Sequence, residues 1–199
     1  METKRLIIVA VGGQGNLLAA KVLGEAALSA GIPVHMSEIH GMAQRGGVVE
    51  SALVFGEARS TIISDGEADA VVGFEPLETL RALNRCNRKT TVITNLAPLA
   101  PFTVAIGRGT YPDIALIQEK IRAKVGRLVA LDAVALARSA GSVLAVNIVL
   151  LGALIRAGIL PLTAEAVRDT IRHRTKAAFV EANLKAFDLG FNHAAEKAV

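Results

Sequence analysis

One short segment, Ser37–Gly47, brings together side chains that could move protons and bind anions. Its candidate site residues are Glu38, His40, Gly41, Gln44, Arg45, Gly46 and Gly47. Side chains two positions apart in an extended segment share a face, so Glu38 and His40 could form a proton-transfer pair. Arg45, followed by two glycines, could clamp a carboxylate or a phosphate. The alternative is structural, with these groups hydrogen-bonding one another and nearby backbone to hold a loop at a subunit interface.

A glycine-rich turn precedes that segment and could bind an anion. The candidate anion-binding residues are Gly12, Gly13, Gln14, Gly15 and Asn16. They lie between an apolar run and a helical pattern, and a helix N-terminus offers free N–H groups and the positive end of its dipole. The dinucleotide fingerprint asks for a further glycine where Leu18 stands, and the Gly-Lys-Ser/Thr of a P-loop is missing. A purely structural tight turn therefore stays open as the alternative.

Two polar residues follow predicted strands, at the edge where open α/β sheets place their binding crevices. Glu75 comes directly after one apolar run, and Asn95 ends the next. Glu75 could equally be an acid favoured by the dipole at a helix N-terminus. Asn147 lies inside a strongly apolar helical segment, so it needs a hydrogen-bond partner if it is buried. We expect Asn147 either to cap a loop from within or to reach a partner chain.

Short apolar runs alternate with helical patterns as far as residue 131. The predicted strands are 6–11, 34–36, 48–55, 70–74, 90–95 and 128–131, with shorter ones at 61–63 and 103–106. The predicted helices among them are 17–30, 75–83 and 113–124. The strand, glycine turn, helix and strand at the start of the chain form a βαβ unit.

Beyond Asp132 the pattern is helical throughout. The predicted helices are 133–140, 143–157, 163–174 and 176–189. This order predicts an α/β fold: a three-layer α/β/α, Rossmann-like domain with a largely parallel or mixed sheet and a helical C-terminal part at about 133–190. We expect residues 1–199 to form one such domain.

Composition argues against several classes of protein. A net charge of only +4 and an aromatic content of 4% argue against a nucleic-acid-binding surface. The apolar run after Met1 is too short for a signal peptide or a membrane span, so we expect a cytoplasmic protein without membrane association. The single cysteine, Cys86, fits a reducing compartment, and we expect it to be an ordinary exposed thiol. No metal site is predicted, because one histidine and one glutamate in the loop are too few for a site and the other histidines, His35, His173 and His193, show no ligand spacing.

Taken together, the motifs resemble a known family. The glycine turn Gly12–Gly15, the string His40–Gly47, and Gly66–Asp69 leading to Phe74–Glu78 are similar to the γ-type domain of the 2-oxoacid:ferredoxin oxidoreductases. The resemblance spans about residues 5–190, and the indolepyruvate enzymes are its nearest pattern. It implies an α/β/α domain that acts as one subunit of an oxidoreductase.

The resemblance also implies partners and cofactors outside this chain. A larger α-type subunit would carry thiamine diphosphate, Mg²⁺ and iron–sulfur clusters, and would pass electrons to ferredoxin. Coenzyme A would accept the acyl group, and the motif loops would face the partner or shape the approach of substrate or coenzyme A. Alone, the chain would bind no cofactor, would be inactive and would self-associate. The alternative function is a stand-alone nucleotide- or anion-binding α/β protein that uses Gly12–Asn16.

Overall fold

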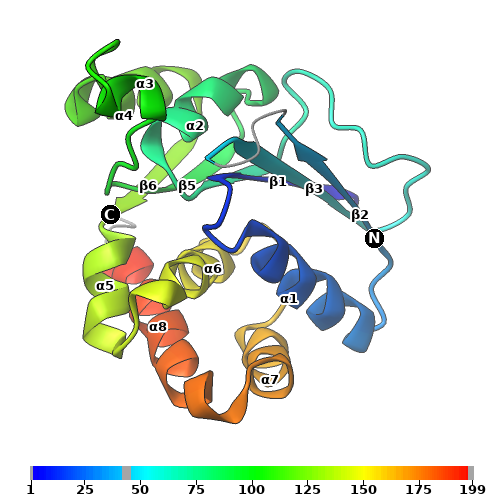
Figure 1. Cartoon of the computed structure of the whole chain (residues 1–199). Coiled ribbons are helices and arrows are strands. Elements are labelled where there is room, and N and C mark those ends of the chain that lie inside the picture. Colours follow the sequence, from blue (N-terminus) through cyan, green and yellow to red (C-terminus); the bar gives the residue numbers. More distant parts are fainter. Residues whose placement is uncertain (1, 42–45, 197–199) are drawn as a thin grey trace.

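The computed structural model describes residues 2–41 and 46–196. Within these residues, six strands form one mixed sheet in the order β2-β3-β1-β4-β5-β6 (Figure 1). The strands are β1 (Lys4–Val11), β2 (Val34–His40), β3 (Val48–Phe55), β4 (Ala70–Gly73), β5 (Thr91–Asn95) and β6 (Arg127–Leu131). Strands β1, β4, β5 and β6 are parallel, whereas β3 runs antiparallel to both β1 and β2. The carboxyl ends of the four parallel strands therefore lie along one edge.

Helices cover both faces of this sheet (Figure 1). On one face lie α1 (Asn16–Ser29), α5 (Ala133–Ala140), α6 (Val146–Ala157), α7 (Ala164–Arg174) and α8 (Ala177–Glu196). On the other face lie α2 (Pro76–Arg81), α3 (Phe102–Ala105) and α4 (Ile114–Lys124). Short 3₁₀ helices at Ala82–Arg85 and Val143–Ala145 follow α2 and precede α6. The predicted α/β fold, with its mixed sheet and helical C-terminal part, is confirmed.

Alternation along β1 explains why two apolar cores form. Leu6 and Ile8 point into the core under α1 and α6, whereas Ile7 and Val9 point into the core under α2 and α4. All four side chains are buried, as expected for a strand with neighbours on both sides and helices on both faces. The continuous apolar run of β1 therefore places its C-terminal end, and the glycine turn that follows, at the edge of a rigid core.

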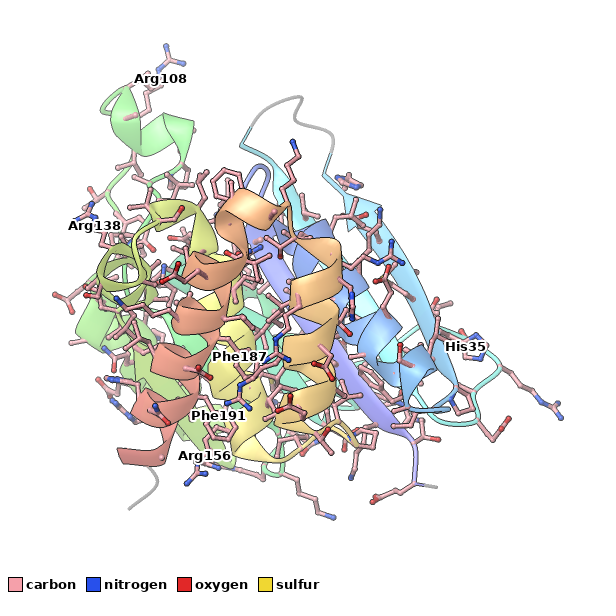
Figure 2. All side chains as sticks on the ribbon, turned by 90° about the horizontal axis from the view of Figure 1, so that it is seen from below. His35, Arg108, Arg138, Arg156, Phe187 and Phe191 are labelled. Carbon is pink, nitrogen blue, oxygen red and sulfur yellow. The ribbon has the colours of Figure 1, made fainter. Side chains whose placement is uncertain are left out.

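Helices α6 and α8 approach closely enough to require glycine on each. A Cβ at Gly152 would lie 2.1 Å from the carbonyl oxygen of Phe187, and one at Gly190 would lie 1.9 Å from that of Val149. Figure 2 shows Phe187 and Phe191 on α8, with Arg156 of α6 beside them; the Arg156 guanidinium lies 5.2 Å from the Phe191 ring centroid. This contact holds the helical C-terminal part against the sheet, because α6 also packs on β5.

Several predicted elements differ in the structure. Residues 37–40 belong to β2 rather than to a loop, because they pair with β3 in a hairpin that extends the ladder. Strand β3 also separates β1 from β2, so the first βαβ unit is not made of adjacent strands. Residues 61–63 form no strand, and the Ile63 carbonyl accepts a bond from the Arg85 guanidinium instead.

Two further expectations also need correction. Residues 103–106 are not a strand, because Pro101 starts the turn that becomes α3, and the N–H groups of Val104 and Ala105 both bond to its carbonyl. Cys86 is not an exposed thiol, because it is buried in the core beneath α2 and α4. Burial raises the pKa of this thiol to about 11, which opposes formation of the reactive thiolate.

Candidate functional site

The glycine turn and the end of the β2–β3 hairpin lie side by side. The backbone N–H of Gly12 donates a hydrogen bond of 2.8 Å to the carbonyl oxygen of Gly47. The N–H of Gly41 donates to the carbonyl of Val48 at 2.8 Å, which continues the hairpin beyond β2. The two glycine-rich motifs of the sequence are therefore neighbours at the carboxyl end of β1. Gln44 and Arg45 lie outside the described residues.

The turn itself is shaped by left-handed glycines and by one glutamine. Gly13 and Gly15 have φ angles of +95° and +81°, which favour glycine strongly. Gln14 accepts a bond from the N–H of Val11 at 2.8 Å and donates to the carbonyl of Phe74 at 3.4 Å, so its side chain ties β1 to β4. In the described part of the chain, the N–H groups of Gly13 and Gly15 donate to no acceptor.

Asn16 belongs to the interior rather than to the open turn. Its amide nitrogen donates to the carbonyls of Ile8 at 3.1 Å and Val49 at 3.0 Å. Its carbonyl oxygen accepts a bond of 2.5 Å from the Ser51 hydroxyl. These three bonds fix the start of α1 against β1 and β3, and they leave the side chain with little capacity for an external anion.

Glu38 and His40 form the pair that their spacing predicts. Both lie on one face of β2, and the His40 Nε2 is 3.4 Å from the Glu38 Oε1. The Glu38 side chain is mostly covered, whereas the imidazole is exposed. Glu38 is opposite Ser51 and His40 is opposite Val49, the two β3 residues that contact Asn16. The acid–imidazole pair is thereby linked through β3 to the start of α1.

Glu75 anchors a neighbouring segment. It is buried, and its carboxylate accepts bonds from the N–H of Glu78 at 2.9 Å, the N–H of Leu99 at 3.2 Å and the Tyr111 hydroxyl at 2.5 Å. It therefore caps α2 and also holds both ends of the connection between β5 and α4. Burial and the bond to Glu75 raise the pKa of Tyr111, so the hydroxyl remains a donor at alkaline pH.

Asn95 is likewise buried and fully engaged. Its amide nitrogen donates to the carbonyls of Phe74 at 3.1 Å and Ala97 at 3.2 Å. Its oxygen accepts from the N–H groups of Ala97 at 3.2 Å and Ala133 at 3.1 Å. Asn95 joins the carboxyl ends of three neighbouring strands. Its amide nitrogen and oxygen already make hydrogen bonds within the protein, which hold that edge of the sheet together.

A cavity of about 460 Å³ opens beside the turn, along the carboxyl ends of the parallel strands. The lining residues come from the glycine turn, the segment after β5, and the starts of α5 and α6: Gly13–Gly15, Leu18, Asn95, Ala97–Leu99, Val134, Val143, Leu144, Val146 and Asn147. Asn147 caps the turn from within, because its amide nitrogen donates to the Gly15 carbonyl at 3.3 Å. The sequence did not predict that Val143 and Leu144 line this cavity. An apolar side chain at the start of a predicted helix was the one feature that could have indicated it.

A larger cavity of about 650 Å³ lies elsewhere, between the end of α1 and α7. Its walls combine polar and apolar surface, and Glu25 on α1 forms an ion pair with Arg174 on α7 there. None of the candidate site residues lines this cavity. Among the described residues, no cluster of three His, Cys, Asp or Glu side chains is arranged to hold a metal ion. No helix in residues 2–41 or 46–196 is long and apolar enough to span a bilayer.

The fold and the site define an α/β protein with a mixed sheet, a glycine turn after its first strand and a crevice at the carboxyl edge. The chain is 41% identical over 198 residues to the indolepyruvate oxidoreductase subunit IorB of Pyrococcus horikoshii, covering 98% of each chain. The keto/oxoacid ferredoxin oxidoreductase gamma subunit of Geobacter sulfurreducens PCA shares the fold, with a TM-score of 0.70 and 23% identity over 97% of this chain and 99% of that one.

A third match is to a longer chain. The 2-oxoglutarate:ferredoxin oxidoreductase of Magnetococcus marinus shares the fold with a TM-score of 0.76 and 16% identity, over 98% of this chain and 32% of that one. The family model for pyruvate ferredoxin/flavodoxin oxidoreductase matches residues 5–193. This chain belongs to that family, as its motifs implied.

Proposed function

We propose that this chain is the small, non-cofactor subunit of a cytoplasmic 2-oxoacid:ferredoxin oxidoreductase whose substrate is indolepyruvate or another arylpyruvate. The observation that carries the proposal is the 41% identity to an IorB subunit along nearly the whole of both chains. The glycine turn, the Glu38–His40 pair and the carboxyl-edge crevice would then shape a contact with the larger subunit, or the approach of substrate or coenzyme A.

The residues of this chain do not fit an iron–sulfur cluster, because such a cluster needs several cysteine thiolates and the single cysteine here is buried. We therefore assign the clusters, together with thiamine diphosphate and Mg²⁺, to a larger α-type partner subunit. That partner would decarboxylate the 2-oxoacid and reduce ferredoxin, and coenzyme A would leave as the acyl thioester. In this assignment, the redox centres belong to the partner subunit, and the present subunit shapes the contact with that partner or the approach of substrate or coenzyme A.

Purification from the native source, followed by mass spectrometry, tests the proposal. We expect a stable complex with a larger chain that binds thiamine diphosphate and carries cluster cysteines, and arylpyruvate oxidation that requires both chains. His40→Ala and Arg45→Ala should reduce turnover or subunit association while leaving the stability of the chain nearly unchanged. Repeated recovery of this chain alone under anaerobic conditions would contradict the proposal.

A stand-alone nucleotide- or anion-binding protein is the second candidate. It is favoured by Gly13 and Gly15, whose N–H groups donate to no acceptor among the described residues and which line a cavity of about 460 Å³. Thermal unfolding of the isolated chain with NAD, FAD, coenzyme A and inorganic phosphate separates the two candidates. A rise in melting temperature with a dinucleotide, in a chain that recruits no larger subunit, would support this function instead.

A further inference from the structure

A second cavity of about 250 Å³ lies beside the crevice at the glycine turn. The two cavities adjoin, because Leu18, Leu144 and Asn147 line both of them, and we treat them together as one surface. We call this surface the turn groove. It runs from the segment after β5, past the starts of α1 and α6, to the junction of α7 and α8. A surface that crosses several elements can contact several residues of a partner segment rather than a single side chain.

The walls of the turn groove expose large apolar side chains. Leu144 is 80% exposed, and it is joined there by Leu18, Leu99, Val143 and Phe179, all of which are also exposed. Soluble monomers rarely gather so many exposed apolar side chains in one place without a partner to cover them. In the described part of the chain, nothing else packs over Leu144. An apolar occupant is therefore expected.

The turn groove also carries one sign of charge. Arg174 and Lys176 line its far end, and no acidic residue lines either cavity. Arg174 pairs with Glu25, but Lys176 forms no ion pair with any described residue. Helices α1, α6 and α8 begin along the groove without an acid in the first turn, whereas α2 and α7 have Glu78 and Glu165 there. The C-terminus of α7 also lies at the groove, so the helix dipoles there do not all have the same sign, and the positive charge of the groove comes from the side chains of Arg174 and Lys176.

We infer that the turn groove docks one segment of the larger partner subunit, and that this segment carries apolar side chains and a carboxylate that meets Lys176. The inference rests on the proposed function for the existence of that subunit. Two copies that met groove to groove would lack a carboxylate for Lys176, because no acidic residue lines either cavity, and an acidic segment of another chain supplies one. The apolar walls and the cation together select an acidic, amphipathic peptide segment.

The test uses the complex of both full-length subunits and matched pairs of variants. Leu144→Glu should weaken association by about tenfold or more, since it places a charge in a buried apolar contact. Lys176→Glu should weaken association by about threefold to tenfold and should reduce its dependence on salt. The controls are Leu116→Glu and Lys120→Glu on α4, which are exposed on the opposite face and should bind like wild type. Thermal unfolding checks that every variant folds.

A photo-crosslinking residue at position 144 identifies the occupant. We expect a crosslink to a peptide of the larger subunit that contains at least one Asp or Glu among apolar residues. If the wild-type complex forms but Leu144→Glu and Lys176→Glu associate normally, the inference is wrong and the proposed function stands. If no complex forms at all, both fail. A crosslink to a second copy of this chain, or loss of coenzyme A binding without loss of association, also overturns the inference.

Discussion

Gly12 and Gly47 are joined through their backbones: the N–H of the first donates to the carbonyl oxygen of the second at 2.8 Å. A Cβ added to Gly12 would lie 3.5 Å from that same oxygen. The bond extends the contact between β1 and β3 beyond their last paired residues, Val11 and Val48. As a consequence, the two glycine-rich motifs form one surface at the edge of the sheet.

Gly15 should tolerate alanine much less well than Gly13. Both residues have positive φ, so either substitution costs the left-handed conformation, about 1–2 kcal/mol. At Gly15 the new Cβ would also lie 2.7 Å from the Asn147 amide nitrogen, whereas nothing lies within 4 Å at Gly13. We expect Gly15→Ala to destabilise the chain by about 2–4 kcal/mol in urea denaturation.

The double variant Gly15→Ala/Asn147→Ala separates the two causes. Removing the Asn147 side chain removes the close contact, so the double change should cost less than the sum of the single changes. If Gly13→Ala and Gly15→Ala lower the free energy of unfolding equally, the close contact with Asn147 does not contribute, and this prediction is wrong.

Helix packing predicts opposite effects for two helical glycines. Gly190→Ala drives a methyl group into the carbonyl of Val149, so α6 and α8 must separate, at a cost of about 3 kcal/mol or more. A Cβ added at Gly24 on α1 would meet nothing within 4 Å, so Gly24→Ala should stabilise the chain by about 0.5–1 kcal/mol through helix propensity. Thermal unfolding of both variants tests this prediction. Similar changes in melting temperature for the two variants would contradict the close approach of α6 and α8.

The hydrogen bond from Tyr111 to Glu75 should stabilise the segment that follows β5. Tyr111→Phe removes the hydroxyl bond to the Glu75 carboxylate, and bonds to charged groups contribute about 1.5–3 kcal/mol. We expect faster amide hydrogen exchange across residues 96–111, measured by mass spectrometry, with exchange in β1 unchanged. Leu99 retains its own bond to Glu75, so exchange near residue 99 should rise less than exchange near residue 111. Unchanged exchange throughout the segment would refute the role.

Glu78 should make stability depend on pH in a defined direction. Burial raises the pKa of this carboxyl above its ordinary value of 4.5, against the opposing effect of Arg81. Because the folded chain holds the Glu78 proton more tightly than the unfolded chain, protonation of Glu78 stabilises the fold. This stabilisation is complete at pH values below the pKa of the unfolded chain, and it is lost as the pH rises through the pKa of the folded chain. Glu78→Gln cannot ionise, so its stability relative to wild type should improve as pH rises from below 4.5 to neutral. Urea denaturation at several pH values measures this, and a constant difference would exclude it.

Sequence patterns predicted most of the elements and several of the local pairings. The apolar runs placed β1, β3 and β5, and the alternation rule placed Glu38 and His40 on one face of an extended segment. The motif string also identified the family, which the comparisons confirm. Roles for Glu38, His40, Gly41, Gly46 and Gly47 at a site stay predictions, as does the single-domain organisation.

Sequence alone determined what depends on neighbours along the chain: strand and helix periodicity, the glycine turn, and family membership. Only the tertiary structure decided that Glu75, Asn95 and Asn16 spend their polar groups inside the protein, because their partners at Tyr111, Ala133 and Val49 are far away in sequence. It also decided that residues 37–40 are strand, since pairing with β3 outweighs local composition. The physical reason is that a hydrogen bond is satisfied by whatever atom the fold brings near, and sequence spacing does not reveal that atom.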